Sequence, residues 1–391
     1  MQTPKSSLAK PQPRAPGLDL LRAVAIVWVL LYHASLFGLA PRDNPIVAFG
    51  WMGVDLFFVL SGFLIAGQLL RPFKQGTRPA YRRFLVRRAL RTLPAYLVVL
   101  AIYFAFPVVR ERPDIRPLWN FLTFTTNLGL PPGAFSHAWS LCVEEQFYLV
   151  FPLALGLFAL RPSLRGAIAV VGGIVLVGMA VRGYLWLGRV ATPPFDIMGS
   201  PDSQKYLKLI YYPTWCRLDG LLAGVVAAAI QVFRPKWWAR LEARPNLALA
   251  CGLAGVILAA ALFQNEIAGF FAAVLGYSLL GLSMAAIVAA GAISNSVIGA
   301  RAIPGAGALA AGSYSLYLSH KMVLHAVGAA ASGWPAPLQL LAAPLALLAA
   351  ILAGAGLYWA VERPFLRLRD RLAGGSRTPI LLEVATAPSA E

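Results

Sequence analysis

The chain has 391 residues, of which 59% are hydrophobic and 13% are charged, whereas soluble domains average about half apolar and about a quarter charged residues. This composition excludes an ordinary soluble enzyme. A formal net charge of +18 would suggest a nucleic acid partner in a soluble protein, but the basic residues fall between long apolar runs, so no nucleic acid binding is expected.

Apolar runs of about twenty residues recur from end to end, and they predict an all-α polytopic membrane helix bundle with about ten transmembrane helices. The segments between the runs would lie alternately on the two sides of a membrane. Those on the same side as both termini hold 23 Lys and Arg residues, and those on the opposite side hold 7. Because basic residues favour the cytoplasmic side, both termini are predicted to be cytoplasmic. The predicted spans are 18–39, 49–70, 93–109, 139–160, 167–187, 210–233, 247–263, 267–292, 307–330 and 337–360.

One membrane domain is predicted over residues 18–368, between a cytoplasmic tail at 1–17 and a disordered cytoplasmic tail at 369–391. The first apolar run is not a signal peptide, because it exceeds the usual length of roughly 7–15 residues and contains Asp19 and Arg22. The three cysteines lack the spacing of a disulfide framework or a metal site, so neither is expected.

Ionisable side chains inside the spans are the clearest functional signal, because each costs about 3 kcal/mol when it is unpaired. Their summed cost would exceed a typical folding stability of about 5–15 kcal/mol, so these side chains must pair or line a wet cavity. The depth of each residue can be estimated by counting about 1.5 Å per residue from the outer end of its span. By this count, most of the ionisable residues and two histidines fall in one layer, from the outer half of the membrane to its midplane. The ionisable residues are Arg22, Asp55, Glu144, Glu145, Arg217, Asp219 and Lys321, and the histidines are His33 and His320.

The first span carries a polar stripe. Arg22 and His33 are eleven residues apart, which is close to three full helical turns, and Asp19 lies on the same face. A structural ion pair with a hydrogen-bonded histidine would also give this pattern. The alignment of three polar groups on one face favours a functional site.

Two adjacent carboxylates, Glu144 and Glu145, open the fourth span. Acidic residues also complement the positive end of a helix dipole, but that role explains one carboxylate at the interface better than two beneath it. Neighbouring helical positions point about 100° apart, so at most one of the two is expected to face a given partner.

Arg217 shares a face with Gly220 and Gly224, a small-residue pattern that allows helices to approach closely. Asp219 points away from Arg217, so the two are not expected to pair.

In the ninth span, Tyr317 and His320 share a face, whereas Tyr314 and Lys321 can be interface anchors. The remaining two histidines, His137 and His325, are treated as incidental.

The segment 71–92 contains eight bases and no acid. Attraction to anionic lipid explains such a segment, but Arg83, Arg87 and Arg91, with Arg88 beside them, form a basic ridge that suits a polyphosphate group. The charge pattern leaves lipid binding and anion binding equally open.

With these residues in place, the sequence resembles the acyltransferase-3 family of integral membrane acyltransferases, which O-acylate sugars and other acceptors in bacterial envelopes. The likeness covers about residues 17–368 and rests on five stretches in order, the first of which has the family's Arg-x10-His spacing. The stretches are Gly17–Ala23 running to Tyr32–His33, Gly53–Ile65, Arg87–Pro94, Trp139–Tyr148, and Ser313–His320 with Val361–Phe365 after it.

The resemblance implies an acyl donor, commonly a coenzyme A thioester, and no permanently bound cofactor or metal. It implies catalytic roles for Arg22 and His33, and extends these to Glu145, Glu144 and Asp55. The family often has Ser where Cys142 stands, and we expect a stand-alone form without an appended extracytoplasmic domain in a bacterial inner membrane. Substrate or acyl-CoA binding is expected of Arg87, Arg88, Arg91, Arg217, Tyr317, His320 and Trp139.

Residues and resemblance together predict transfer of an acyl group, most simply acetyl, from acyl-CoA to a hydroxyl of an envelope saccharide, glycolipid or related acceptor. His33 is the predicted general base, oriented by Glu144 or Glu145, while Arg217 or Tyr317 opposes charge on the thioester oxygen. An acyl-histidine intermediate is an open variant. The alternatives are a transporter or flippase of a lipid-linked saccharide, for which no paired interrupted segments are seen, and a lipid-binding pseudoenzyme.

Overall fold

The computed structural model describes residues 15–129, 133–159, 163–190, 201–265 and 269–372, and within these ranges the chain is helical and contains no strand. The predicted all-α bundle is therefore confirmed. Most of the predicted N-terminal tail, and residues 373–391 of the predicted C-terminal tail, lie outside the described residues. Residues 369–372 of that second tail are helical, because the last helix continues to Leu372.

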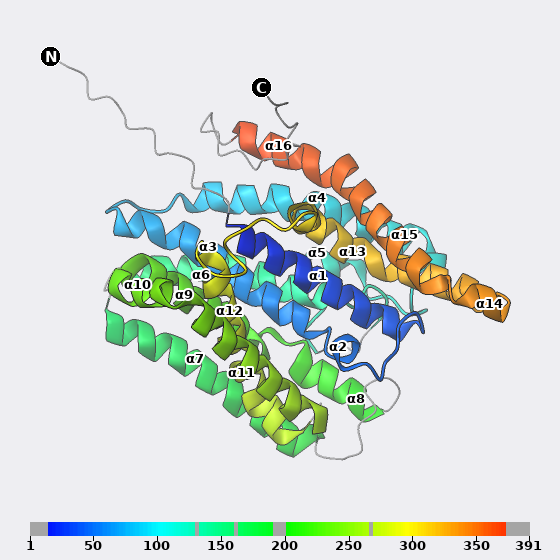
Figure 1. Ribbon diagram of the computed structural model, residues 1–391, viewed down its shortest axis with the longest axis horizontal. Coiled ribbons are helices and arrows are strands. Elements are labelled where there is room, and N and C mark those ends of the chain that lie inside the picture. Colours follow the sequence, from blue (N-terminus) through cyan, green and yellow to red (C-terminus); the bar gives the residue numbers. More distant parts are fainter. Residues whose placement is uncertain (1–14, 130–132, 160–162, 191–200, 266–268, 373–391) are drawn as a thin grey trace.

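Ten long helices carry the bundle (Figure 1). They are α1 (Pro16–Leu36), α3 (Met52–Lys74), α4 (Tyr81–Ala105), α6 (Ala138–Phe158), α7 (Leu164–Leu185), α9 (Leu218–Phe233), α11 (Pro245–Asn265), α12 (Tyr277–Ala292), α13 (Ala306–Ala331) and α15 (Ala342–Leu357). The shorter helices are α2 (Pro45–Ala48), α5 (Leu118–Leu122), α8 (Pro201–Tyr206), α10 (Pro235–Ala243), α14 (Ala336–Gln339) and α16 (Arg363–Leu372).

Each predicted span overlaps one of these helices, but the predicted number of transmembrane helices is not confirmed. Seven helices of the described chain are long and apolar enough to cross a membrane, or up to eight if the bent pair α9 and α10 is one span. These two helices meet at an angle of 104°. Neither α4 nor α13 is among the seven; α4 begins with a run of arginines, and α13 carries His320 and Lys321 in its middle.

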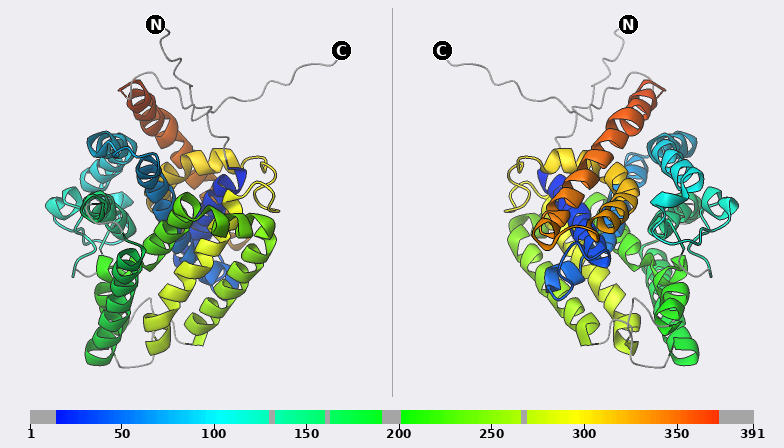
Figure 2. Two further views of the ribbon diagram at one scale, coloured as in Figure 1. Left: turned by 90° about the vertical axis from the view of Figure 1, so that its left-hand side faces the viewer. Right: turned by 90° about the vertical axis from the view of Figure 1, so that its right-hand side faces the viewer.

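Two groups of helices flank α1 and α3 (Figures 1 and 2). On one side, α9 and α12 pack against α3, and α11 packs against α12. On the other side, α13 lies between α1 and α15, and α16 packs against α4. Since α13 passes through the middle of the bundle, its polar residues face protein and the cavities between helices.

Segments that are predicted to be cytoplasmic lie together. Pro16 at the start of α1, Glu242 near the end of α10 and Asn295 after α12 line one hollow. The Asn295 side-chain amide also donates a hydrogen bond to the Glu242 carbonyl. The predicted orientation requires this shared side of the bundle.

Glycines bring α3 and α9 into backbone contact, as the small-residue pattern predicts. A Cβ atom at Gly224 would meet the Val59 carbonyl oxygen and would lie 2.7 Å from the Phe63 nitrogen, and a Cβ at Gly62 would meet the Leu221 carbonyl oxygen. Backbone atoms of a packed helix cannot move aside as a flexible side chain can. The close approach of α3 and α9 therefore depends on these glycines.

Gly224→Ala is expected to destabilise the protein by about 1–3 kcal/mol, because the new methyl group overpacks a backbone contact. The measurement is thermal unfolding of the purified protein in detergent. Gly172→Ala on α7 is the matched control, because a Cβ there meets nothing within 4 Å. Equal stability of the two variants would contradict the proposed backbone contact.

Candidate active site

The helix α6 begins inside the bundle. His137, directly before it, has its Nε2 atom 3.2 Å from the Leu318 carbonyl oxygen and its ring 5.1 Å from that of His320, midway along α13. Seven residues further on, Glu144 is therefore about 10 Å closer to the end of the bundle that is predicted to be cytoplasmic. The predicted single layer of polar residues is wrong, because the count assumed that α6 starts at the membrane surface.

Three histidines from different parts of the chain meet at the start of α6. The His320 Nε2 and His33 Nδ1 atoms are 2.9 Å apart, and the two ring centroids are 4.9 Å apart. His137 lies beside both rings, at 6.3 Å from His33. Within the described chain, no set of residues that could hold a metal ion was found. We call these three residues the histidine cluster.

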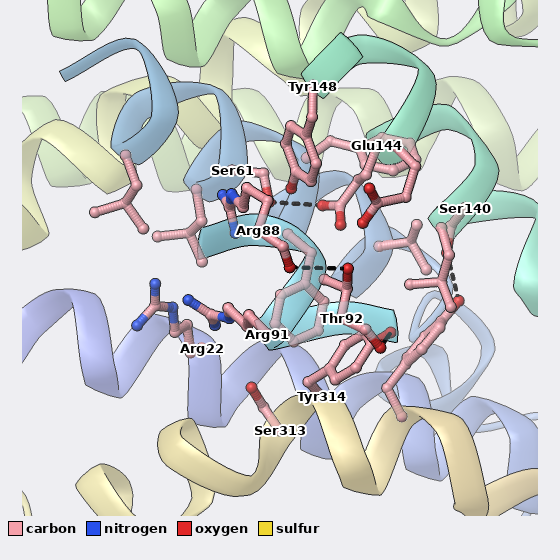
Figure 3. A pocket seen from close by; sticks show the side chains of 18 of the residues that line it. Arg22, Ser61, Arg88, Arg91, Thr92, Ser140, Glu144, Tyr148, Ser313 and Tyr314 are labelled. Atoms are coloured by element: carbon pink, nitrogen blue, oxygen red, sulfur yellow. Dashed lines mark hydrogen bonds between the residues drawn. The ribbon is translucent and has the colours of Figure 1, made fainter. Parts of the chain in front are cut away.

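A cavity lies between α1, α3, α4, α6 and α13 (Figure 3). It contains about 930 Å³ of space not filled by atoms, part of which is open to the surroundings. About half of its wall is polar, although it lies inside a membrane protein. The ionisable groups of the wall are Arg22, Arg88, Arg91, Glu144 and Glu145, and its hydroxyl groups belong to Ser61, Thr92, Ser140, Tyr148, Ser313, Tyr314 and Tyr317.

The arginines of the cavity are only partly neutralised. Arg22 and Arg91 extend side by side from α1 and α4 (Figure 3). Arg22 has Asp19 as an ion-pair partner at 3.7 Å, whereas Arg88 and Arg91 have no carboxylate within ion-pair distance in the described part of the chain. Guanidinium groups that share a cavity repel one another, so this arrangement favours a bound anion.

Glu144 belongs to this cavity and is held there by other groups. The Ser61 hydroxyl donates a hydrogen bond of 2.6 Å to its carboxylate, and Arg88 and Tyr148 of the same wall lie close to it. The structure therefore does not place Glu144 as the partner of His33. The partner that it gives His33 is His320.

Tyr317 connects the cavity with the histidine cluster. It lines the cavity, while its hydroxyl lies 2.7 Å from Ser140 Oγ and donates to the His137 carbonyl oxygen at 2.9 Å. Its ring centroid is 5.7 Å from that of His320. A group bound in the cavity therefore has only this side-chain layer between it and the imidazoles.

Asp55 and Arg217 lie outside the cavity wall. They form a buried ion pair of 2.8 Å between α3 and the start of α9, and Arg217 also lies 4.0 Å from the centre of the Tyr277 ring. Trp139 packs edge-on against Phe58 and takes no part in the cavity wall either. The catalytic role predicted for Asp55 and the substrate-binding roles predicted for Arg217 and Trp139 thus lack a place in this cavity, because none of the three side chains lines it.

The second buried ion pair joins α7 to α9. Arg182 and Asp219 are 2.7 Å apart. The prediction that Asp219 is not the partner of Arg217 is confirmed.

The predicted basic ridge divides. Arg88, Arg91 and Thr92 line the cavity, whereas Arg87 lies near Arg369 and Asp370 of α16, which packs against α4. Side chains at i, i+3 and i+4 share a helix face, and residue 87 falls beside that face.

Two features escaped the sequence analysis. His137, treated as incidental, belongs to the histidine cluster, and Lys321, treated as an anchor, forms a buried ion pair of 3.0 Å with Glu111. Lys321 also donates a hydrogen bond to Ser136. The signal for His137 was its position two residues before Trp139, but the sequence did not show that this segment lies inside the bundle.

Glu111 lies on a loop that is predicted to be on the outer side, and its partner Lys321 lies on α13. Burial raises the pKa of this carboxyl, but the Lys321 ammonium and then His137 lower it, and the pKa falls to about 2. Glu111 also accepts a hydrogen bond from the Phe135 amide at 3.0 Å. This contact fixes the loop segment that leads into His137.

Comparison with known proteins gives the family of the chain. The acyltransferase-3 family model, described as an acyltransferase domain, matches residues 16–359. The chain belongs to this family. All five sequence stretches that carry the resemblance contribute residues to the cavity or the histidine cluster.

The relatives are similar in sequence over part of their length. A peptidoglycan O-acetyltransferase OatA of Listeria monocytogenes is 29% identical over 238 residues, which is 56% of this chain and 34% of the relative. A putative peptidoglycan O-acetyltransferase YrhL of Bacillus subtilis is 30% identical over 234 residues, which is 55% and 33% of the two chains. The matched region thus spans about a third of these relatives. No solved structure matches the chain.

The roles of Asp55 and Arg217 can be separated by a double-mutant cycle. Asp55→Leu and Arg217→Met are each expected to cost about 3–5 kcal/mol, because each leaves a buried charge without its partner, while the double variant costs clearly less than their sum. Thermal unfolding measures the stabilities, and acyl transfer is assayed in parallel. A stable double variant that lacks all transfer would restore the catalytic role predicted for Asp55.

The Glu111 ion pair predicts a pH dependence of stability. A carboxyl whose pKa is lowered by folding stabilises the protein above its unfolded pKa, and loses that contribution as pH falls through the folded value. The pair is therefore expected to contribute about 3 kcal/mol at pH 7. The difference in melting temperature between the wild type and Glu111→Gln should stay constant from pH 8 to about pH 5 and shrink below that. A difference that already disappears at pH 6 would show that this carboxyl is not held ionised.

Proposed function

We propose that the protein transfers an acyl group, most simply acetyl, from acyl-CoA to a hydroxyl of an envelope saccharide, with His33 as the general base. The observation that carries this proposal is that the arginine-lined cavity and the histidine cluster are separated by the single side-chain layer of Tyr317 and Ser140. Such a site holds a charged donor on one side of the layer and a base on the other. Membership of an acyltransferase family favours this reaction over the alternative of transport.

The donor side of the cavity suits the phosphates of coenzyme A. Arg22, Arg88 and Arg91 present three guanidinium groups, the side chains that match phosphate oxygens in pairs of hydrogen bonds. Arg22 lies near the start of α1 and Gln68 near the end of α3, the two ends that belong to the predicted cytoplasmic side. The soluble donor is therefore proposed to enter from the cytoplasm.

The pantetheine arm of the donor is thin and would extend toward Tyr317. There the hydroxyls of Tyr317 and Ser140, which bond to each other and to the His137 carbonyl oxygen, would turn a hydrogen toward the thioester oxygen as negative charge develops on it. Glu144 and Glu145, in the same cavity, are then neighbours of the donor, where they offset part of the arginine charge.

The chemical step needs one proton transfer. His33 takes the proton of the acceptor hydroxyl, the oxygen attacks the thioester carbon, and the carbon–sulfur bond breaks. The coenzyme A thiolate that leaves then takes up a proton. All atoms are accounted for without a metal or redox cofactor as a reactant.

The acceptor class is proposed from the relatives. One is named as a peptidoglycan O-acetyltransferase and another as a putative one, and a saccharide hydroxyl would approach His33 from the predicted outer side, where the end of α1 packs against α13. We propose that the protein works in the bacterial cytoplasmic membrane, with acyl-CoA on one side and the saccharide on the other.

His33→Gln is expected to lower acyl transfer by about 10²–10⁴-fold, which is the usual contribution of general base catalysis. The measurement is the rate of coenzyme A release from acetyl-CoA, by purified protein in lipid nanodiscs with a peptidoglycan fragment as acceptor. Binding of the donor should stay unchanged, because His33 is not part of the cavity wall. Wild-type transfer by this variant would exclude His33 as the base.

Arg88→Gln is expected to raise the KM for acetyl-CoA by about 10-fold or more, since it removes a charge-assisted hydrogen bond to phosphate. Arg82→Gln is the matched control, because Arg82 lies on the same helix and is exposed. Titration calorimetry with coenzyme A measures the donor affinity directly. Equal affinities for the two variants would show that the phosphates bind elsewhere.

A further inference from the structure

The backbone of α13 determines which ring nitrogen of His320 carries the proton. Its Nδ1 atom lies 2.8 Å from the Tyr317 carbonyl oxygen and 3.2 Å from the Leu316 carbonyl oxygen. A carbonyl oxygen only accepts hydrogen bonds, so Nδ1 of His320 must be the donor. In a neutral imidazole the other nitrogen is then an acceptor, and this makes Nε2 of His320 a lone-pair nitrogen.

The position of the hydrogen on His320 determines its position on His33. The Nδ1 atom of His33 is 2.9 Å from Nε2 of His320, so it must carry the hydrogen that joins them. Nε2 of His33 is then left with its lone pair. His33 is partly exposed, whereas His320 is fully buried, so the free lone pair belongs to the imidazole that a substrate can reach.

Apart from the Val29 carbonyl oxygen, which lies one turn earlier on α1 and is a further acceptor for a ring N–H of His33, the groups around His33 do not offer a competing acceptor. On α13, Lys321 is paired with Glu111. His137, before α6, has its Nε2 atom at the Leu318 carbonyl oxygen, and its ring is 6.3 Å from that of His33. On α1 itself, the Tyr32 ring lies edge-on to His33 at 5.4 Å.

We infer that His320 is a positioning residue, which holds His33 in the tautomer that leaves Nε2 free to take the acceptor proton. The inference rests on the proposed function in that His33 is the base. His320 takes the place that a carboxylate has in other base-orienting arrangements, and that the sequence assigned to Glu144 or Glu145.

The arrangement also supports the step after proton transfer. Once His33 has gained a proton at Nε2, its Nδ1 hydrogen still points at the neutral Nε2 atom of His320, and a charge-assisted hydrogen bond is stronger than a neutral one. The proton does not pass on to the backbone, because the Nδ1 atom of His320 already has its hydrogen. It stays on His33 until the coenzyme A thiolate takes it.

The test compares His320→Gln with His320→Ala in full-length protein in nanodiscs. The Gln amide oxygen can reach the position of the imidazole Nε2 atom and accept the same hydrogen bond, whereas Ala cannot. We expect His320→Ala to lower kcat by at least about 10-fold with the KM for acetyl-CoA unchanged, and His320→Gln to recover most of the loss. His325→Gln is the control, because His325 lies on the same helix against the Phe37 ring, outside the histidine cluster.

The tautomer itself is measured by nitrogen NMR of protein labelled in histidine, without any need for activity. The chain has four histidines, so the His33 signals are identified by their loss in His33→Gln. We expect the hydrogen of His33 on Nδ1 in the wild type and in His320→Gln, and a shift toward Nε2 in His320→Ala.

The outcomes separate this inference from the proposed function. A wild-type His33 with its hydrogen on Nε2 would overturn the inference whatever the activity, and so would a kcat of His320→Ala equal to that of His325→Gln. If the tautomers agree with expectation but His33→Gln still transfers acetyl groups, then the proposed function fails and the structural assignment stands. If His320→Ala does not fold, the spectra of the wild type and of His320→Gln still test the inference.

Discussion

The cost of placing charge inside a membrane protein governs this structure, because every ionisable group within the bundle needs a partner or a wet cavity. Most of the predicted charges found partners. Asp55 pairs with Arg217, Asp219 with Arg182, and Glu111 with Lys321. Of the charges predicted inside the spans, those that remain incompletely paired line the cavity, where three arginines face two glutamates. Neutralisation thus separates the structural charges from the candidate functional ones.

The site is divided along the direction of the helices. Arginines and hydroxyls line the part that lies toward the predicted cytoplasmic side, the histidines lie beyond it, and Tyr317 touches both regions. This division suits a reaction between a charged donor and an acceptor that never share a solvent. The position of His137 shows how the division arises, because the segment before α6 enters the bundle and lets α6 start at the depth of the imidazoles.

Sequence reasoning found the right residue types but assigned several of them to the wrong neighbours. It identified Arg22, Arg88, Arg91 and Glu144, all of which line one cavity, and it placed His33 and His320 at similar depth. The pairing of Glu144 with His33 and the treatment of His137 as incidental both failed, because both depend on where α6 begins. Helical periodicity gives the face of a side chain, but it does not give the height of one helix relative to another.

The sequence by itself determined the helical membrane class, the cost of its inner charges and the family, since these follow from apolar run length, composition and short motifs. Tertiary structure alone decided which charges cancel, that the arginine ridge divides between cavity and α16, and that an imidazole faces His33. The physical reason is that pairing energies act over a few ångströms between helices far apart in the chain. Those separations are set by packing, such as the glycine contacts of α3 and α9, and no local pattern encodes them.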